Sequence, residues 1–445
     1  MTTLTAAEQN AGRVRRLPRY TRERRAEAGM LILAAAITIF AYVLAAVGKY
    51  STMPANLVPI LVAMIAMMGV VHVTNLYLAP HADPIIMPLV ALLNGLGYVM
   101  ITRLDHPEAL LQGIWTAVGV AAYIVTLLVV RRIETLDKYR YLFALLGLGL
   151  LVLPLAPGIG ENINGARLWV HLGPMSFQPV ELAKLALAVF FASYFIEKQD
   201  LLSGGLGTSG RKFTLNIRVL GPLLAAWLGS LLIMTAERDV GFSLMVFLVF
   251  IITLWVATSR ISYLIAGSVM FGVGAVVASK LFGQVNERIV TWIDPWKYAE
   301  TIGYQIVQAQ YALGAGGLSG TGLGRGHPNL IPVVSSDFIF AAIGEEMGLL
   351  GTTAIVIAFA LLVGAGIRAA QRSSSPFASL LAASFTLIIG LQSFFIMAGI
   401  VRLLPLTGVT LPFVAYGGSS LVSNYILVAV LMRISNESSE DALRF

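Results

Sequence analysis

Residues 377–400 read FASLLAASFTLIIGLQSFFIMAGI and contain no Asp, Glu, Lys or Arg. A helix of about 20 predominantly apolar residues is long enough to cross the hydrocarbon core of a bilayer. Eleven further segments have similar character, so the sequence predicts an all-α, polytopic transmembrane helix bundle of about twelve spans. The twelve segments are 30–48, 56–78, 85–101, 112–130, 140–156, 180–196, 219–236, 242–258, 262–282, 337–366, 377–400 and 411–432.

The composition of the whole chain supports this prediction. Of its 445 residues, 57% are hydrophobic and 12% are charged, whereas soluble domains contain about 25% charged residues. Mean hydropathy is +0.82, so soluble, disordered, collagen-like and disulfide-rich classes are excluded. The net charge of +7 does not indicate nucleic-acid binding, because seven arginines precede the first span, as in a cytoplasmic anchor.

The distribution of Lys and Arg predicts the orientation in the membrane. With the N-terminus inside, 20 of these residues fall in cytoplasmic tails and loops and 8 fall outside, in agreement with the positive-inside rule. Both termini are therefore expected in the cytoplasm, as tails 1–29 and 436–445. Two outer loops, 157–179 and 283–336, are too long to be turns, and the second, before the tenth span, is a functional candidate.

Ionisable residues inside spans are costly and often functional. Glu181 and Lys184 share a helix face, which fits either an internal ion pair or a functional site. Asp337 precedes an apolar run, so it either caps a helix or acts as a carboxylate base at the outer mouth of the bundle. Glu345 and Glu346 lie further along, and at most one is expected to face a partner.

Two other segments have open interpretations. The charged run 237–239 suggests a water-accessible cavity between two spans. Seven glycines lie between Gly314 and Gly326, as expected for a flexible or re-entrant loop or for backbone amides that line an anion site. The histidines show no metal-ligand spacing, so a zinc hydrolase is not indicated.

Six motifs occur in a fixed order and together resemble the SEDS family, which comprises the RodA, FtsW and SpoVE proteins. The resemblance covers residues 85–435 as a core of ten spans, with two additional spans in 30–84. The motifs are NGARLW at 164–169, QPVELAK at 178–184, GYQIVQ at 303–308, SDFIF at 336–340, GEEMG at 344–348 and LPFVAYGGSS at 411–420.

The resemblance implies a peptidoglycan glycosyltransferase. Such an enzyme polymerises lipid II into β-1,4 glycan strands on the outer face of the cytoplasmic membrane, with inversion at the anomeric carbon. Asp337 matches the family's catalytic aspartate. The expected substrate-binding residues are Arg167, Trp169, Gln178, Glu181, Lys184 and Arg402. Among them, Arg402 is a candidate cation for binding the diphosphate.

The resemblance also implies cofactors and partners. A divalent cation, Mg or Mn, is a candidate cofactor, with no ligands assigned. The expected partners are lipid II, the growing glycan strand, a class B penicillin-binding transpeptidase and membrane lipids, but not nucleic acid.

The chain departs from the family pattern at two places. Residues 237–241 read ERDVG, where Gln-Pro-Asp-Leu-Gly is usual, and Thr407 stands where a Lys is frequent. The additional spans at 30–84 resemble those of actinobacterial RodA proteins, which favours a role in cell elongation and shape over division.

The alternative functions are an FtsW-type division polymerase, a flippase or transporter of lipid-linked precursors, and a non-catalytic scaffold. An outer carboxylate favours the enzyme.

Overall fold

The structure, a computed structural model, describes residues 22–51, 57–156, 159–163, 166–172, 175–204, 217–236 and 240–442. Within these ranges, helices coincide with all twelve predicted segments, which confirms the all-α polytopic fold. Eight of them are long and apolar enough to cross a membrane by themselves. The twelve helices are α2 (Arg22–Tyr50), α3 (Leu57–Leu78), α4 (Ile86–Leu104), α5 (His106–Val129), α7 (Arg140–Val152), α8 (Val180–Glu197), α10 (Ile217–Ala236), α11 (Val240–Thr258), α12 (Ile261–Leu281), α15 (Ile339–Arg372), α16 (Pro376–Ile400) and α17 (Gly418–Ala442).

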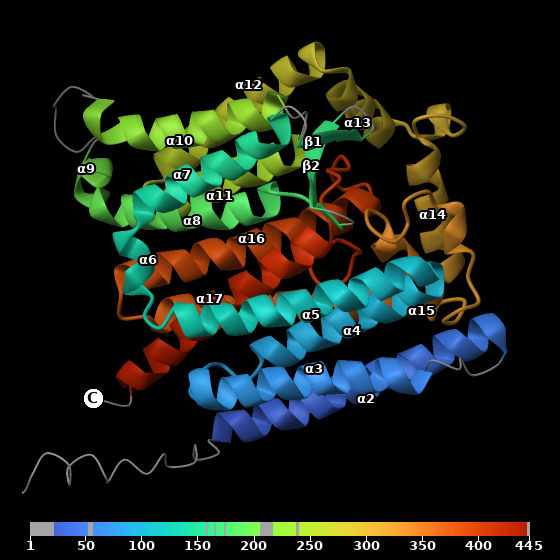
Figure 1. The fold of residues 1–445 in the computed structure, drawn as a ribbon. Helices are drawn as coiled ribbons and strands as arrows, with labels where there is room; N and C mark the ends of the chain where they lie inside the picture. The colour runs from blue at the N-terminus through green and yellow to red at the C-terminus, as the bar shows by residue number, and fades with distance from the viewer. Residues whose placement is uncertain are drawn as a thin grey trace, which may run out of the picture.

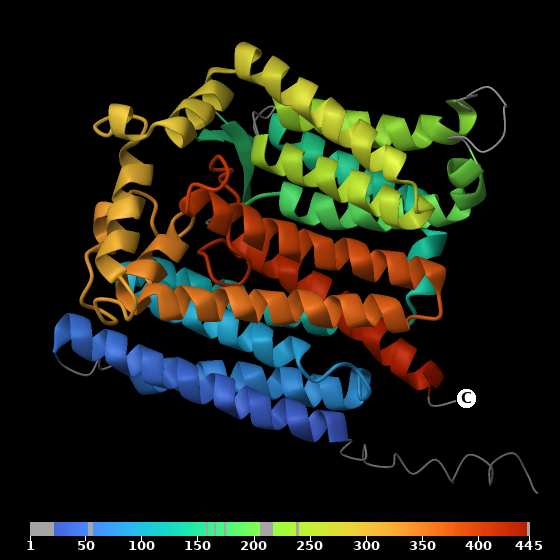
Figure 2. The same cartoon turned by 180° about the vertical axis from the view of Figure 1, so that it is seen from behind.

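The helices run side by side, and the bundle has two distinct ends. Figures 1 and 2 show the start of α2 and the end of α17 at one end, and α13 (Gly283–Ile293) and α14 (Tyr304–Gly316) at the other. The predicted long loop at 283–336 is therefore largely helical. Shorter elements complete the chain: α6 (Glu134–Lys138), α9 (Gln199–Gly204) and the 3-10 turns η1 (Leu153–Leu155), η2 (Trp296–Tyr298) and η3 (Pro328–Leu330).

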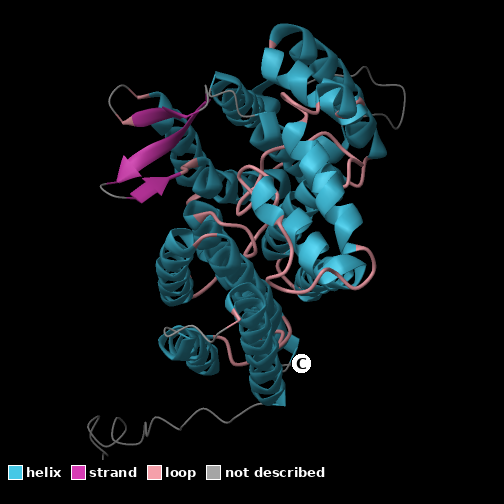
Figure 3. Ribbon diagram, turned by 90° about the vertical axis from the view of Figure 1, so that its right-hand side faces the viewer, coloured by secondary structure: helices cyan, strands magenta, loops and turns pink. Residues whose placement is uncertain are grey.

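The other predicted outer loop, 157–179, contains a small antiparallel sheet that the sequence analysis missed. Its strands are β1 (Gly160–Ile163), β2 (Ala166–Leu172) and β3 (Met175–Phe177), in the order β1-β2-β3. Figure 3 shows this sheet at the edge of the helical bundle. The Asn-Gly dipeptide at 164–165 is a strong hairpin signal that could have revealed the sheet.

The core surrounds α8, whose side chains are buried on nearly all sides. Phe191 packs edge-to-face on Phe250 at 5.2 Å between ring centroids, and Trp227 stacks on the same ring at 4.9 Å. α8 is thus enclosed by neighbouring helices and does not face lipid. Polar residues in the first turns of α8 are therefore inside the bundle as well.

The last predicted span, 411–432, is displaced in the structure. Residues 401–417 form a folded loop, and α17 begins only at Gly418 and continues to Ala442. The late residues of α17 stay packed, because Arg433 donates hydrogen bonds to the carbonyls of Leu78, Leu127 and Val130 at 2.7, 2.6 and 2.9 Å. The loop 401–417 thus takes the place of the first turns of a span.

The predicted span 337–366 is also modified, because α15 begins at Ile339 and is interrupted at Gly348. Gly348 has φ 65° and ψ −164°, outside the helical region. After the break, Leu349 N donates to Gly317 O at 2.9 Å and Leu350 N donates to Leu318 O at 3.2 Å. The interruption therefore docks the end of α14 and the turn that follows it onto α15.

Replacing Gly348 by Ala is expected to destabilise the protein by about 1–3 kcal/mol, because positive φ is strained for Ala. A Cβ at this position would also lie 2.3 Å from Gly320 N. Thermal unfolding of the detergent-solubilised protein measures the change. Gly364→Ala is the control, because a Cβ at Gly364 meets only Arg368 Nη1, at 3.9 Å. Equal midpoints for Gly348→Ala and the unmodified protein would contradict the prediction.

Candidate active site

Asp337, the predicted base, immediately precedes α15, which begins at the end of the bundle opposite the start of α2 and the end of α17. Phe338 is the N-cap residue of α15, and no side chain hydrogen-bonds at this cap, so the capping interpretation of Asp337 is not supported. The side chain is partly buried. Burial raises the pKa of Asp337 above its ordinary value, whereas a hydrogen bond with Ser336 and the charge of Arg288 oppose this rise. The carboxyl is thus a better proton acceptor than an exposed aspartate.

Arg288, on α13, is a charged neighbour of Asp337 that the sequence analysis did not single out. Its Nη1 donates to Thr407 O at 2.9 Å. Its Nη2 lies 3.3 Å from where a Cβ on Gly408 would be, so a glycine leaves room for the guanidinium. Arg288 therefore contacts the loop 401–417, and its charge acts on the carboxyl of Asp337. Apolar residues at 285, 289, 292 and 293 recur at helical spacing and predict an amphipathic helix, a signal for a cation placed at this surface.

Arg402 holds the same loop against α13. Its Nη2 donates to Trp292 O and Ile293 O, both at 3.1 Å, and Trp292 Nε1 donates to Arg402 O at 3.0 Å. These reciprocal bonds give Arg402 a clear structural role. Its predicted contact with a substrate diphosphate stays a prediction.

Glu181 and Lys184 form a buried ion pair in the first turns of α8. Lys184 Nζ also donates to Gln392 Oε1 at 2.8 Å, and Ser423 Oγ donates to Glu181 Oε2 at 3.0 Å. Glu181 Oε1 has no hydrogen-bond partner among the described residues. A cavity of about 10 Å³ adjoins Lys184, which is room for roughly one water molecule. The ion pair is thus present, and one carboxylate oxygen of Glu181 is left without a partner among the described residues. A functional role for these two residues stays a prediction.

The loop 401–417 connects this buried pair to Asp337. Gln392, whose Oε1 accepts a hydrogen bond from Lys184, donates through Nε2 to Thr410 O at 3.1 Å. Arg288 Nη1 donates to the backbone oxygen of Thr407, three residues earlier in the loop. At the other end of the loop, Tyr416 N donates to Ser335 O at 2.9 Å, two residues before Asp337. The loop therefore contacts both predicted parts of the site, and the hydroxyls of Thr407 and Thr410 have no partners in the described structure.

The remaining predicted substrate residues flank this arrangement. Gln178 is buried, and its backbone N donates a hydrogen bond to Ser419 Oγ at 2.8 Å, at the start of α17. Trp169 is half-buried in β2, opposite Glu161 of β1. Arg167 belongs to the same strand, but its side chain lies outside the described structure. Gln178 thus joins the buried group, whereas Trp169 belongs to the sheet.

Backbone amides in and next to the glycine-rich segment 314–326 form hydrogen bonds with side chains of α15. Gly324 N donates to Glu346 Oε2 at 2.9 Å and His327 N donates to Glu345 Oε1 at 2.7 Å. Arg103 pairs with the other oxygen of Glu346 at 2.7 Å. Glu346 therefore has a charged partner and Glu345 accepts a hydrogen bond from a backbone amide, in agreement with the expectation that at most one of them faces a charged partner. Since carboxylates of α15 already bind these amides, the ordered re-entrant loop is favoured over the anion site.

The described residues do not fit a resident metal site. They contain no group of three or more His, Cys, Asp or Glu side chains that could hold a metal ion, whereas hard divalent cations take six or more oxygen ligands. The charged residues Glu237, Arg238 and Asp239, for which the sequence suggested a water-accessible cavity, lie outside the described residues. A divalent cation stays a prediction.

Comparison with known proteins gives consistent matches. A family model described as FTSW_RODA_SPOVE, cell cycle protein, matches residues 84–440. Peptidoglycan glycosyltransferase RodA of Mycobacterium tuberculosis H37Rv is 40% identical over 429 residues, covering 93% of this chain and 90% of that protein. Probable peptidoglycan glycosyltransferase FtsW of Geobacter sulfurreducens (strain ATCC 51573) is 36% identical, covering 73% and 84%.

A solved structure shares the fold. The matching chain comes from work on structural coordination of polymerization and crosslinking by a peptidoglycan synthase complex. It has a TM-score of 0.64 and 23% identity, and the match covers 80% of this chain and 98% of that one. At this identity the match supports the arrangement of the helices but not the roles of individual residues.

Proposed function

Because the chain belongs to the FtsW/RodA/SpoVE family, we propose that Asp337 is the base with which it polymerises lipid II. The chain is a peptidoglycan glycosyltransferase and an integral membrane protein of the cytoplasmic membrane. The observation that supports the assignment of the base is the partly buried carboxyl of Asp337, with a raised pKa, beside Arg288.

The proposed reaction is a direct displacement. The carboxylate of Asp337 accepts the proton of the acceptor sugar's 4-hydroxyl, and that oxygen forms a bond to the anomeric carbon of the lipid-linked strand. The bond from this carbon to the diphosphate oxygen breaks, and the diphosphate leaves with the electron pair. An α-linked donor thereby gives a β-linked product, so the stereochemistry inverts.

The leaving diphosphate needs positive charge or hydrogen-bond donors near the reacting centre. Lys184 is already neutralised by Glu181, and Arg402 Nη2 is bonded to backbone carbonyls of α13. Arg288 contacts the loop through Nη1 and carries its charge close enough to Asp337 to oppose the rise in pKa. We therefore assign to Arg288 the stabilisation of the diphosphate, with Arg167 and Lys184 as secondary candidates.

Replacing Arg288 by Met is expected to reduce polymerisation about 10- to 100-fold, the effect of losing one charge-assisted interaction of about 1.5–3 kcal/mol. The loss of positive charge also raises the pKa of Asp337 further, so the acid limb of the activity profile moves to higher pH. Turnover of purified protein across a pH series measures both effects. Arg288→Lys should recover part of the rate, and an unchanged acid limb in Arg288→Met would contradict this role.

The relatives favour a role in elongation. The mycobacterial RodA protein matches more of this chain, at higher identity, than the Geobacter FtsW protein. We therefore propose an elongation polymerase that works with a class B penicillin-binding transpeptidase, and the solved complex supports such a partner. The excess of Lys and Arg on one side supports cytoplasmic termini and an outer active site.

The proposed function is tested with the purified, folded protein and labelled lipid II, with and without a divalent ion and the transpeptidase. Glycan polymer is the expected product. Absence of polymer in every combination, together with movement of labelled lipid II across reconstituted vesicles, would establish the transporter instead.

A further inference from the structure

The N-terminal helices α2 and α3 enclose a cavity together with α4, α5 and α17. Its volume is about 440 Å³, within the range of sites for small ligands. Small residues on α3 and α5, such as Ala63, Gly113 and Ala117, leave the space open. Methionines at 64, 67, 68 and 87 line it, and their flexible side chains adapt to irregular apolar ligands.

The cavity extends along the helices that line it. It is lined by α4 from Met87 to Tyr98, which is about 16 Å of helix at a rise of 1.5 Å per residue. Half of a bilayer's hydrocarbon core is about 15 Å thick. The lining residues Ala63 and Ala117 are exposed, so the cavity opens sideways. Its length thus matches the hydrocarbon of one leaflet.

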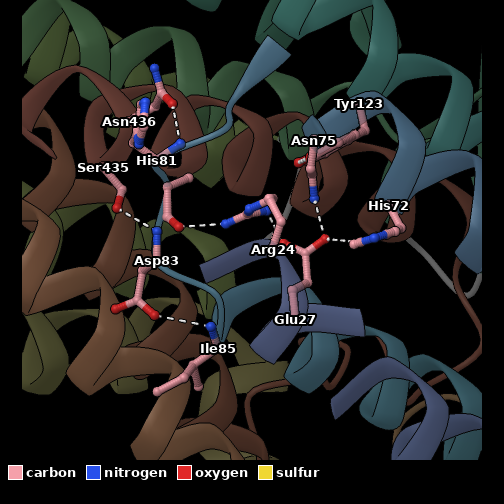
Figure 4. A network of polar contacts seen from close by, with 11 residues as sticks. Arg24, Glu27, His72, Asn75, His81, Asp83, Ile85, Tyr123, Ser435 and Asn436 are labelled. Carbon is pink, nitrogen blue, oxygen red and sulfur yellow. Dashed lines mark hydrogen bonds and ion pairs between the residues drawn. The ribbon is translucent and has the colours of Figure 1, made fainter. Parts of the chain in front are cut away.

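A polar network closes the end of the cavity nearer the start of α2 and the end of α17. Figure 4 shows Glu27 of α2 between Arg24, His72 and Asn75. Glu27 Oε1 lies 2.9 Å from His72 Nδ1 and accepts from Asn75 Nδ2 at 3.1 Å, while Tyr123 Oη donates to Asn75 Oδ1 at 2.6 Å. These bonds join α2, α3 and α5 at one level.

The cavity begins directly beyond this network on all three helices. Leu31 follows Glu27 by about one turn, and Val71 precedes His72. Val120 precedes Tyr123 by about one turn. The network therefore closes this end of the cavity, and a hydrocarbon chain can enter only through the sideways opening at Ala63 and Ala117.

One buried polar atom indicates that the cavity is filled in the native protein. Asn94, which lines the cavity and is 6% exposed, donates through Nδ2 to Tyr425 Oη at 3.1 Å and to Thr116 Oγ1 at 3.4 Å. Its Oδ1 has no hydrogen-bond partner among the described residues. Empty cavities in proteins are apolar, and a buried unpaired acceptor is costly. A water molecule at Asn94 beside an apolar ligand fills such a space.

We propose that this cavity binds one acyl chain of a glycerophospholipid from the surrounding bilayer. The apolar wall, the sideways opening and the end closed by the polar network suit a hydrocarbon chain that enters from the side. The length of about 16 Å favours an acyl chain over a polyprenyl chain long enough to span the whole bilayer. The N-terminal hairpin thus holds a lipid against the core.

Native mass spectrometry of the detergent-purified protein, with identification of the released lipid, tests this proposal. Ala63→Phe combined with Ala117→Phe fills the cavity. Ala66→Phe combined with Ala121→Phe is the matched control, because both residues are exposed on the same helices and do not line the cavity. We expect one retained phospholipid in the unmodified and control proteins and at least about tenfold less in the filled variant. Asn94→Leu should retain the lipid.

Equal retention by the filled and control variants would overturn the proposal, and so would a bound polyprenyl phosphate. A second measurement needs no variant: a photoactivatable phospholipid is reconstituted with the unmodified protein. Its cross-links are expected within 63–71 and 87–98, and cross-links confined to other helices would overturn the proposal. Polymerisation by the filled variant is measured in parallel, so failure of this proposal is distinguished from failure of the proposed enzymatic function.

Discussion

Replacing Asp337 by Asn is expected to lower the rate of lipid II polymerisation about 10²- to 10⁴-fold, the contribution typical of a positioned acid or base. The amide is nearly the same size as the carboxyl but cannot accept the proton of the acceptor hydroxyl. Since no side chain caps α15, the substitution removes no capping bond, and the protein should remain folded. Single-turnover assays with labelled lipid II measure the rate, and thermal unfolding verifies the fold.

Asp294→Asn provides the control for this experiment. Asp294 follows α13, is exposed, and accepts a hydrogen bond from Lys297 N at 3.3 Å. Its replacement removes a carboxylate from the same end of the bundle without touching Asp337, so activity should change less than about twofold. If Asp337→Asn retained the unmodified rate, another group would have to accept the proton.

The pH dependence provides an independent test of the same assignment. The base works when ionised, so activity falls as the pH drops through the pKa of Asp337. Burial raises that pKa, and the acid limb should therefore lie at higher pH than for an exposed aspartate. For the same reason, ionising this carboxyl costs more in the folded than in the unfolded protein. Its contribution to stability is present at low pH and is lost as the pH rises through the raised pKa.

The apolar segments were predictable because a bilayer demands long runs without charge. All twelve predicted segments contain helices, and the largest error is at 411–432. There Pro412 and Gly417 break the apolar run, and 401–417 folds as a loop. Sequence hydropathy does not distinguish apolar residues buried in a loop from apolar residues facing lipid. The sheet at 160–177 was missed because its strands are short.

The site was only partly predictable, because its contacts join residues far apart in the sequence. Arg288 and Thr407 are separated by 119 positions, and no local pattern indicates that they meet. The pair of Glu181 and Lys184 was accessible because both residues lie on one helix face. The roles of Arg402 and Glu345 needed the fold, since their partners belong to other elements.

Replacing Lys184 by Met is expected to destabilise the protein by about 3–5 kcal/mol, because it leaves the Glu181 carboxylate buried without its partner. The free energy of unfolding in an SDS titration measures the loss. Arg140→Met is the matched control: its pair with Glu197 is partly exposed, so a loss below about 1 kcal/mol is expected. A similar small loss for Lys184→Met would show that its pair is hydrated rather than buried.

The double variant Glu181→Gln with Lys184→Met separates stability from function. The double variant contains no unpaired buried carboxylate, so it should recover most of the stability that Lys184→Met alone loses. The amide can still accept from Ser423, which now bonds Glu181 Oε2. If polymerisation returns with stability, the pair acts by holding α8 against α16 and α17. If the stable double variant stays inactive, the charges themselves contact the substrate, because packing alone would have been restored.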